Sequence, residues 1–240
     1  MRVGLFVTCL VDQIYPQAGL ATLRLLRFLG LDVVFDPRQT CCGQPAFNTG
    51  YRDEARCVAE TALGLYADCE AVVAPSGSCV AMLKFHVPEL FAGSPELQQR
   101  AEALARKTWE LSDFIVNRLG VTDVGAKFEH RVAFHDSCHT LRELGIREEP
   151  RRLLREVRGL ELVELTGSGA CCGFGGTFSV KFPDVSAAMG RDKVRAIRDS
   201  GARFLAGTDV SCLMHLQGLM QREGVPVETR HLAEILVEEL

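Results

Sequence analysis

Two short stretches of the 240-residue sequence contain adjacent cysteines followed by glycine: Cys41-Cys42-Gly43-Gln44-Pro45-Ala46-Phe47 and Cys171-Cys172-Gly173-Phe174-Gly175-Gly176-Thr177-Phe178. Each pair has a further cysteine upstream, with 31 or 32 residues between, and another downstream, with 36 or 39 residues between. These are Cys9 and Cys79 in the first half and Cys138 and Cys212 in the second. Corresponding cysteines lie 129 to 133 residues apart. A repeat of this length is too long for a solenoid unit and indicates a duplicated domain.

The duplication divides the chain into two expected domains, residues 1–125 and residues 126–240. Eight of the ten cysteines follow the repeat. The remaining two, Cys57 and Cys69, have no counterpart in the other half. We expect both to be small buried hydrophobic residues, because free cysteine usually behaves in this way.

The composition is that of a soluble globular protein, with 47% hydrophobic and 24% charged residues. A net charge of −4 argues against nucleic acid as the main partner. No apolar run approaches the ~18 residues of a membrane span, and the N-terminal apolar stretch lacks a cleavage site, so we expect a cytoplasmic location. Ten cysteines in a reducing compartment favour metal binding or redox chemistry over disulfides.

Strand patterns and helix patterns alternate along both halves of the chain. The strand patterns span residues 2–8, 31–35, 71–74, 132–134, 160–165 and 204–206. The helix patterns span residues 20–29, 53–67, 94–115, 150–157, 184–199, 212–222 and a segment from residue 231. This alternation predicts an α/β fold of two similar domains, each with a parallel sheet flanked by helices, related by pseudo-twofold duplication.

Every repeated cysteine follows a predicted strand. In an open parallel sheet the loops after the strands meet at one edge, where ligands bind. We therefore expect two quartets of neighbouring thiols, namely Cys9, Cys41, Cys42 and Cys79 in the first half and Cys138, Cys171, Cys172 and Cys212 in the second. Nearby glycines allow the backbone to approach a cofactor and to donate N–H groups to sulfide.

The sequence resembles the cysteine-rich CCG domain family, which includes a heterodisulfide reductase subunit and the iron–sulfur subunit of glycolate oxidase. It is most similar to the short two-domain members, the lactate utilization protein A family. The resemblance covers nearly the whole chain. Besides the two Cys-Cys-Gly stretches, it rests on residues 5–12, on Pro75-Ser76-Gly77-Ser78-Cys79 and on Cys212-Leu213-Met214.

This resemblance implies an iron–sulfur electron-transfer subunit of a multi-subunit complex that oxidises L-lactate, a 2-hydroxy acid, to pyruvate. The implied cofactor is one or two [4Fe–4S] clusters held by the eight repeated cysteines. The implied partners are a ferredoxin-like iron–sulfur protein and a third small subunit. The chain would then be the redox subunit of an L-lactate dehydrogenase complex.

The sequence departs from the fuller family pattern, which ends each half in Cys-x-x-Cys. Ser76 and Asp209 stand at the earlier of those two positions, so each half has four cysteines rather than five. Four thiolates are the number that an ordinary [4Fe–4S] cluster takes. They are also the number in a closed structural zinc site, so zinc in one half remains open.

Three alternatives remain from the residues themselves. The first is a zinc-stabilised scaffold that binds partner subunits without carrying electrons. The second is a set of ordinary buried thiols or a disulfide pair. The third is direct catalysis at an open cluster position, for which nearby polar residues are Asp12, Gln44, His139 and Lys181.

Two further groups of residues have simpler interpretations. Three histidines flank the second quartet: His135, His139 and His215. Histidine replaces cysteine in some clusters, but the first half has no equivalent histidines, so we expect these three beside the centre or at the surface. A second group, the basic run Arg151, Arg152 and Arg155, is typical of a solvated helix face.

Overall fold

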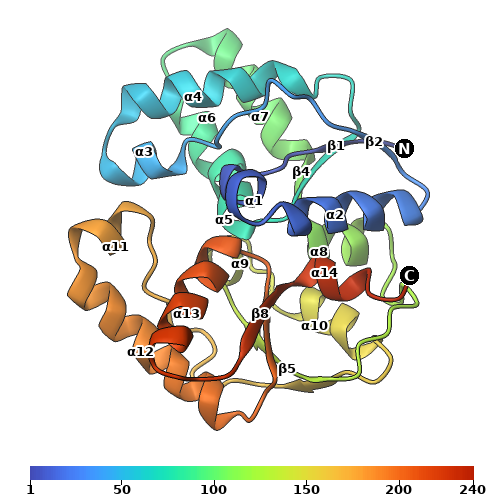
Figure 1. Ribbon diagram of the computed structural model, residues 1–240. Helices are drawn as coiled ribbons and strands as arrows, with labels where there is room; N and C mark the ends of the chain where they lie inside the picture. The colour runs from blue at the N-terminus through green and yellow to red at the C-terminus, as the bar shows by residue number, and fades with distance from the viewer. The chain divides into compact units, whose positions relative to one another are not determined.

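The computed structural model describes residues 1–240, which form two compact units, Met1–Phe114 and Ile115–Leu240. Each unit contains one four-stranded sheet with helices around it (Figure 1). All the strand pairs are parallel. The predicted α/β class of two similar domains, each with a parallel sheet and flanking helices, is therefore confirmed. The domain boundary between residues 125 and 126 stays a prediction.

In the first unit the strand order is β2-β1-β3-β4. The strands are β1 (Arg2–Leu5), β2 (Asp32–Val34), β3 (Ala71–Ala74) and β4 (Thr108–Glu110). The helices are α1 (Cys9–Ile14), α2 (Pro16–Phe28), α3 (Gln44–Thr49), α4 (Arg52–Leu65), α5 (Gly77–Ala81), the π-helix η1 (Met82–His86), α6 (Val87–Leu90), α7 (Pro95–Lys107) and α8 (Leu111–Asp113). Every residue of β3 is buried, which accounts for its unbroken apolar sequence.

In the second unit the strand order is β6-β5-β7-β8. The strands are β5 (Arg131–His135), β6 (Glu161–Val163), β7 (Phe204–Gly207) and β8 (Glu228–His231). The helices are α9 (Cys138–Arg142), α10 (Glu148–Arg155), α11 (Thr177–Lys181), α12 (Pro183–Asp199), α13 (Val210–Arg222) and α14 (Leu232–Leu236). A second π-helix, η2 (Phe114–Arg118), begins at the last residue of the first unit.

The two sheets have the same pairing register as well as the same strand order. Val3 on β1 lies opposite Ala71 on β3. Val132 on β5 lies opposite Phe204 on β7. The two residues of the second pair follow those of the first by 129 and 133 positions, the same displacements that relate the cysteines. The strands of the two units can therefore be compared residue by residue.

The long helix predicted over residues 94–115 is wrong. α7 ends early and β4 follows it directly, with Thr108 opposite Val72 of β3. The carboxylate of Glu110, the last residue of β4, then accepts a hydrogen bond from the backbone N–H of Ser112 and caps α8. Pairing with β3 and this cap override the helical spacing of the apolar side chains.

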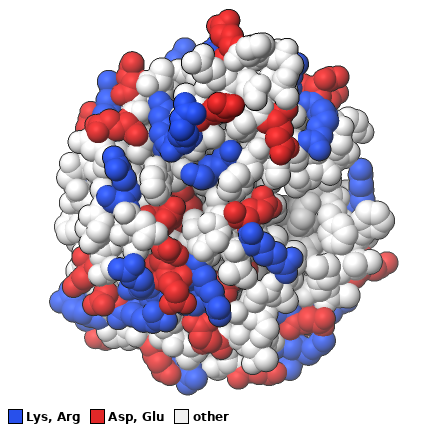
Figure 2. Space-filling model, turned by 180° about the vertical axis from the view of Figure 1, so that it is seen from behind, with Lys and Arg blue, Asp and Glu red and all other residues white.

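The surface carries charges of both signs. On the face shown in Figure 2, Lys and Arg side chains are interspersed with Asp and Glu side chains. Several form exposed ion pairs, such as Arg131 with Glu161 and Arg203 with Glu228. Exposed pairs contribute only about 0–1 kcal/mol each, so the stability of each unit rests chiefly on its apolar core. None of the helices combines the length and apolar character needed to cross a lipid bilayer.

Candidate metal centre

The repeated cysteines lie beyond the carboxyl ends of the strands in both units. The first of each quartet starts a short helix, since Cys9 is the first residue of α1 and Cys138 is the first residue of α9. The adjacent pair lies in the loop between β2 and α3, or between β6 and α11. The last cysteine lies near the start of α5 or α13, after β3 or β7. Because these loops share one edge of a parallel sheet, cysteines far apart in the sequence come together.

In the first unit the four thiols form one group. The Sγ atoms of Cys9 and Cys41 are 3.5 Å apart, and those of Cys42 and Cys79 are 3.4 Å apart. The thiols of Cys41 and Cys42 also interact, which joins the two pairs. Cys42 and Cys79 are buried, whereas Cys9 and Cys41 are partly exposed. The quartet therefore has an inner half and an outer half.

The second unit repeats this arrangement. The Sγ atoms of Cys172 and Cys212 are 3.1 Å apart and both residues are buried. The Cys171 thiol interacts with Cys138 and Cys172, and Cys138 and Cys171 are partly exposed. The structure thus brings together all four predicted positions in each unit. Their role as metal ligands stays a prediction.

Contacts within each quartet favour the thiolate form of some of its cysteines. In the first unit the pKa of Cys41 is lowered, first by its hydrogen bond with Cys42 and then by that with Cys9. In the second unit the pKa of Cys171 is lowered, first by Cys138 and then by Cys172. The pKa of Cys212 is also lowered, to about 6, first by its hydrogen bond with Cys172 and then by the neighbouring His135. Thiolates are the form in which cysteine binds metals. Four clustered thiols that include readily ionised members match both a [4Fe–4S] cluster and a zinc ion in the number and type of their donors.

The glycine after each cysteine pair shapes the loop around the first thiolate. The backbone N–H of Gly43 donates to the Sγ of Cys41 over 3.5 Å, and that of Gly173 donates to the Sγ of Cys171 over 3.4 Å. Both glycines have a left-handed backbone, with φ of 88° and 90°. Any residue with a side chain would be strained at either position, so the backbone conformation of the loop requires glycine after each cysteine pair.

Gly173→Ala should destabilise the second unit more than Gly43→Ala destabilises the first. Both substitutions place a side chain in the left-handed region, at a cost of roughly 1–2 kcal/mol. An added Cβ at residue 173 would also overlap the carbonyl oxygen of Ser186, whereas at residue 43 it would lie 3.1 Å from that of Ala55. Chemical denaturation of each variant measures the two losses of unfolding free energy.

Gly50→Ala is the control for this comparison. Gly50 has the same left-handed backbone, with φ of 91° and ψ of 2°, but a Cβ built there meets open space. This variant should show the backbone strain alone. Equal losses from Gly173→Ala and Gly50→Ala would contradict the proposed overlap with α12.

A cavity of about 330 Å³ opens beside the outer thiols of the first unit. It is lined by Val7, Cys9, Asp12, Gln13, Phe35, Pro37, Gln39, Thr40 and Cys41. The Gln39 side chain is held in place, because its Oε1 accepts hydrogen bonds from the backbone N–H of Val7 and from the hydroxyl of Tyr66. A small molecule or a partner side chain has access to this side of the quartet.

The four polar residues considered for direct catalysis are placed differently. Asp12 lines the cavity beside Cys9 and Cys41. Gln44 donates a hydrogen bond to the carbonyl oxygen of Ser78, which fits a structural role. The second unit holds the other two, His139 next to Cys138 and Lys181 at the exposed end of α11. Asp12 therefore combines proximity to a quartet with a cavity.

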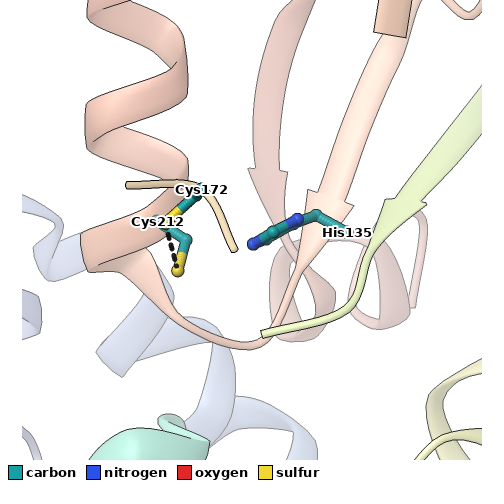
Figure 3. Close-up of side chains that lie close together, drawn as sticks. All are labelled: His135, Cys172 and Cys212. Atoms are coloured by element: carbon teal, nitrogen blue, oxygen red, sulfur yellow. Dashed lines mark hydrogen bonds between the residues drawn. The ribbon is translucent and has the colours of Figure 1, made fainter. Parts of the chain in front are cut away.

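The three histidines of the second unit also differ in position. The Nδ1 atom of His139 lies 3.6 Å from the Sγ of Cys138. His215 is partly buried, and its Nε2 lies 3.5 Å from the hydroxyl of Ser186. His135 is buried and points directly at the inner thiols of Cys172 and Cys212 (Figure 3). The sequence pattern does not show which of the three histidines faces the thiols. The feature that could have identified His135 is its place at the end of a predicted strand.

Ser76 and Asp209 stand where the family pattern has a fifth cysteine. The Ser76 hydroxyl accepts a hydrogen bond from the backbone N–H of Cys79 and caps α5. Asp209 is buried, and its carboxylate lies 3.5 Å from the Thr140 hydroxyl. Neither residue adds a sulfur to its quartet, which agrees with four thiols in each unit.

Three expectations about individual residues are settled by their burial. Cys69 is buried as predicted, but the prediction for Cys57 is wrong, because it lies on the exposed side of α4. The expectation of a solvated basic run is wrong for Arg151, whose guanidinium is buried against Asp136 and Glu164. The other two arginines of that run are exposed as predicted.

Two units of one topology, each with four cysteines at the same edge of a parallel sheet, define a tandem cysteine-rich domain protein. The family model described as CCG, cysteine-rich domain, matches residues 3–84 and 132–217. Proteins named lactate utilization protein A match the full chain. The Exiguobacterium sp. protein is 50% identical over 99% of this chain and 97% of its own length, and the Bacillus subtilis protein is 47% identical over 98% and 99%. The chain belongs to this lactate utilization protein A family of CCG cysteine-rich domain proteins.

A solved structure supports the fold. The crystal structure of a hypothetical protein from Helicobacter pylori matches with a TM-score of 0.67 and 13% sequence identity. The match covers 98% of this chain but 48% of the Helicobacter pylori chain, so the present chain spans about half the length of that structure. At this identity the similarity concerns the fold alone.

Proposed function

We propose that the protein is the iron–sulfur electron-transfer subunit of a multi-subunit complex that oxidises L-lactate to pyruvate. The observation that carries this proposal is the pair of matching thiol quartets at the edges of two equivalent sheets. The name of its relatives, lactate utilization protein A, supports a role in lactate utilisation. The further partners would be a ferredoxin-like iron–sulfur protein and a third small subunit in the cytoplasm.

The residues of this chain would bind, shield and tune such clusters. All eight repeated cysteines would serve as ligands, and a bound cluster would supply one-electron transfer. The burial of the inner thiols, such as Cys42 and Cys172, excludes water from one side. The N–H groups of Gly43 and Gly173 donate toward the sulfur-rich centre and stabilise its negative charge.

A buried cation adds to this stabilisation in the second unit. The Lys193 ammonium donates hydrogen bonds to the carbonyl oxygens of Gly167 and Ser168, in the loop that leads to the cysteine pair. Burial lowers the pKa of Lys193, while the nearby Asp136 and thiols such as Cys172 act in the opposite direction. A positive charge at this place favours an anionic set of thiolates.

The outer thiols define where electrons would enter and leave. Cys9 and Cys41 line the cavity of the first unit, and Cys138 and Cys171 are the partly exposed members of the second quartet. A redox partner that docks over these residues would approach the centres on their less buried side. The chain needs no general acid or base for this task, since the proposed chemistry at each quartet is electron transfer alone.

Metal analysis of protein purified without air tests the proposal. Each occupied unit should contain about four iron and four sulfide. Dithionite should bleach the thiolate-to-iron absorbance and produce a paramagnetic signal. In the assembled complex, L-lactate should reduce the same centres. Protein that takes up zinc but no iron, or clusters that L-lactate fails to reduce in the complex, would contradict the proposal.

A zinc-stabilised scaffold is the second candidate. It is supported by the distances between the cysteine Sγ atoms, which are close to those around a single zinc ion. Two sulfurs bound to one tetrahedral zinc, each about 2.3 Å from the metal, lie roughly 3.8 Å apart. The paired thiols are separated by 3.1 to 3.5 Å, a similar distance. One zinc and no sulfide per unit in the same metal analysis would establish this alternative.

A further inference from the structure

The two units differ at the carboxyl end of their central strand pairing. His135 ends β5, where it lies opposite Gly207 of β7. The matching residue of the first unit is Phe6, whose backbone N–H donates to the carbonyl oxygen of Val73 on β3. Both side chains are buried, with 2% and 1% of their surface exposed. The same place in the fold therefore holds an imidazole in one unit and an apolar ring in the other.

The hydrogen bonding of the His135 ring is unusual for a buried histidine. Neither Nδ1 nor Nε2 has a partner within ordinary hydrogen-bond geometry, although both atoms are buried, and the ring interacts with the Cys212 thiol alongside it. A buried polar group without a partner lowers stability, so such groups in native proteins require an explanation. A metal ion or cluster bound beside the ring would satisfy one of these nitrogens.

The direction of the ring identifies the group that it would bind. A ring nitrogen of His135 and the Sγ atoms of Cys172 and Cys212 all lie within 4.8 Å of one another. Figure 3 shows the imidazole of His135 pointing toward the two thiols. One nitrogen and two sulfurs at this spacing are a typical partial ligand set for zinc or iron.

We propose that His135 is a nitrogen ligand of the centre in the second unit, together with Cys172 and Cys212, and that it takes the place of one of the two outer thiols, so that three cysteines and one histidine would bind this centre. The first unit has Phe6 at this place and would hold an all-sulfur centre. The inference rests on the proposed metal-binding role of the quartets and goes beyond it, because it makes the two centres chemically different. A neutral imidazole brings less negative charge than a thiolate, so an iron–sulfur cluster in the second unit would have the higher reduction potential.

Pulsed paramagnetic resonance on the reduced full-length protein tests this ligand directly. Protein labelled with ¹⁵N only at histidine should show a strong nitrogen coupling in one cluster signal. His135→Phe, which installs the side chain of the first unit, should remove that coupling and lower the potential of the same centre. His135→Gln should also remove the histidine coupling, and it serves as a second variant if the phenylalanine does not fit.

His215→Gln is the matched control. His215 lies in the same unit and is partly buried, but it faces Ser186 rather than the inner thiols. This variant should keep the nitrogen coupling and the potential of the wild type. The proposal fails if wild-type protein with iron in the second unit shows no coupling to histidine nitrogen, or if His135→Phe leaves the coupling unchanged.

X-ray absorption at the zinc edge tests the same ligand when the second unit holds zinc. The wild type should show imidazole scattering with a Zn–N distance of about 2.0–2.1 Å, and His135→Phe should show sulfur ligands alone. Zinc with a histidine ligand and no iron in either unit would keep this inference and overturn the proposed electron transfer. Iron in both units with all-sulfur coordination would overturn the inference about His135 and keep the proposed electron transfer. The absence of any bound metal would overturn both proposals.

Discussion

Cys42→Ser should remove the metal from the first unit alone, and Cys172→Ser should remove it from the second alone. Each of these thiols is buried and contacts two other cysteines of its quartet. A serine hydroxyl does not ionise at neutral pH and is a poor ligand for thiophilic metals. Each single variant should retain about half of the wild-type iron, and the double variant should retain none.

Cys57→Ser is the control for this experiment. Cys57 is exposed on α4 and belongs to neither quartet, so its replacement should leave iron and sulfide contents unchanged. Paramagnetic resonance of the two single variants then assigns each signal to one unit. Loss of all iron from either single variant, or no loss from one of them, would contradict two independent centres.

The arrangement of the site could be predicted because it depends on local sequence and on one topological rule. The cysteines follow apolar strand patterns, and loops after parallel strands meet at one edge. The segment of residues 71–74 is fully buried and has a purely apolar sequence, so its strand was correctly placed. β4 could not be predicted in the same way, because Thr108–Glu110 has no apolar strand pattern and lies within the helical spacing of residues 94–115.

Side-chain environments were harder to predict than strands. His135 and His139 both lie within three residues of Cys138 in the sequence. Of the two, His135 points at the inner thiols, because it ends a strand. Arg151 and Arg152 are neighbours on α10, and the turn of the helix buries one and exposes the other. The acidic partners that accept a buried arginine come from other elements, so one-dimensional spacing does not reveal them.

Arg151→Met should destabilise the second unit by about 3–5 kcal/mol. The Nη1 and Nη2 atoms of Arg151 each donate to an oxygen of Asp136 over 2.8 Å, and both side chains are almost fully buried. Glu164, which is half exposed, accepts two further hydrogen bonds. Without the guanidinium, the Asp136 carboxylate is left buried and uncompensated. Thermal unfolding should show a midpoint lowered by roughly 10 °C.

Two companion variants distinguish the uncompensated charge from simple loss of packing. Glu164→Gln should have a small effect, because Glu164 is exposed enough for water to replace its interaction with Arg151. Adding Asp136→Asn to Arg151→Met should restore part of the lost stability, because an amide is cheaper to bury than a carboxylate. Asp136 lies two residues before Cys138, so Arg151→Met should also reduce the metal content of the second unit. Equal stability of the single and double variants would show that the lost contacts of Arg151, and not the buried charge, cause the destabilisation.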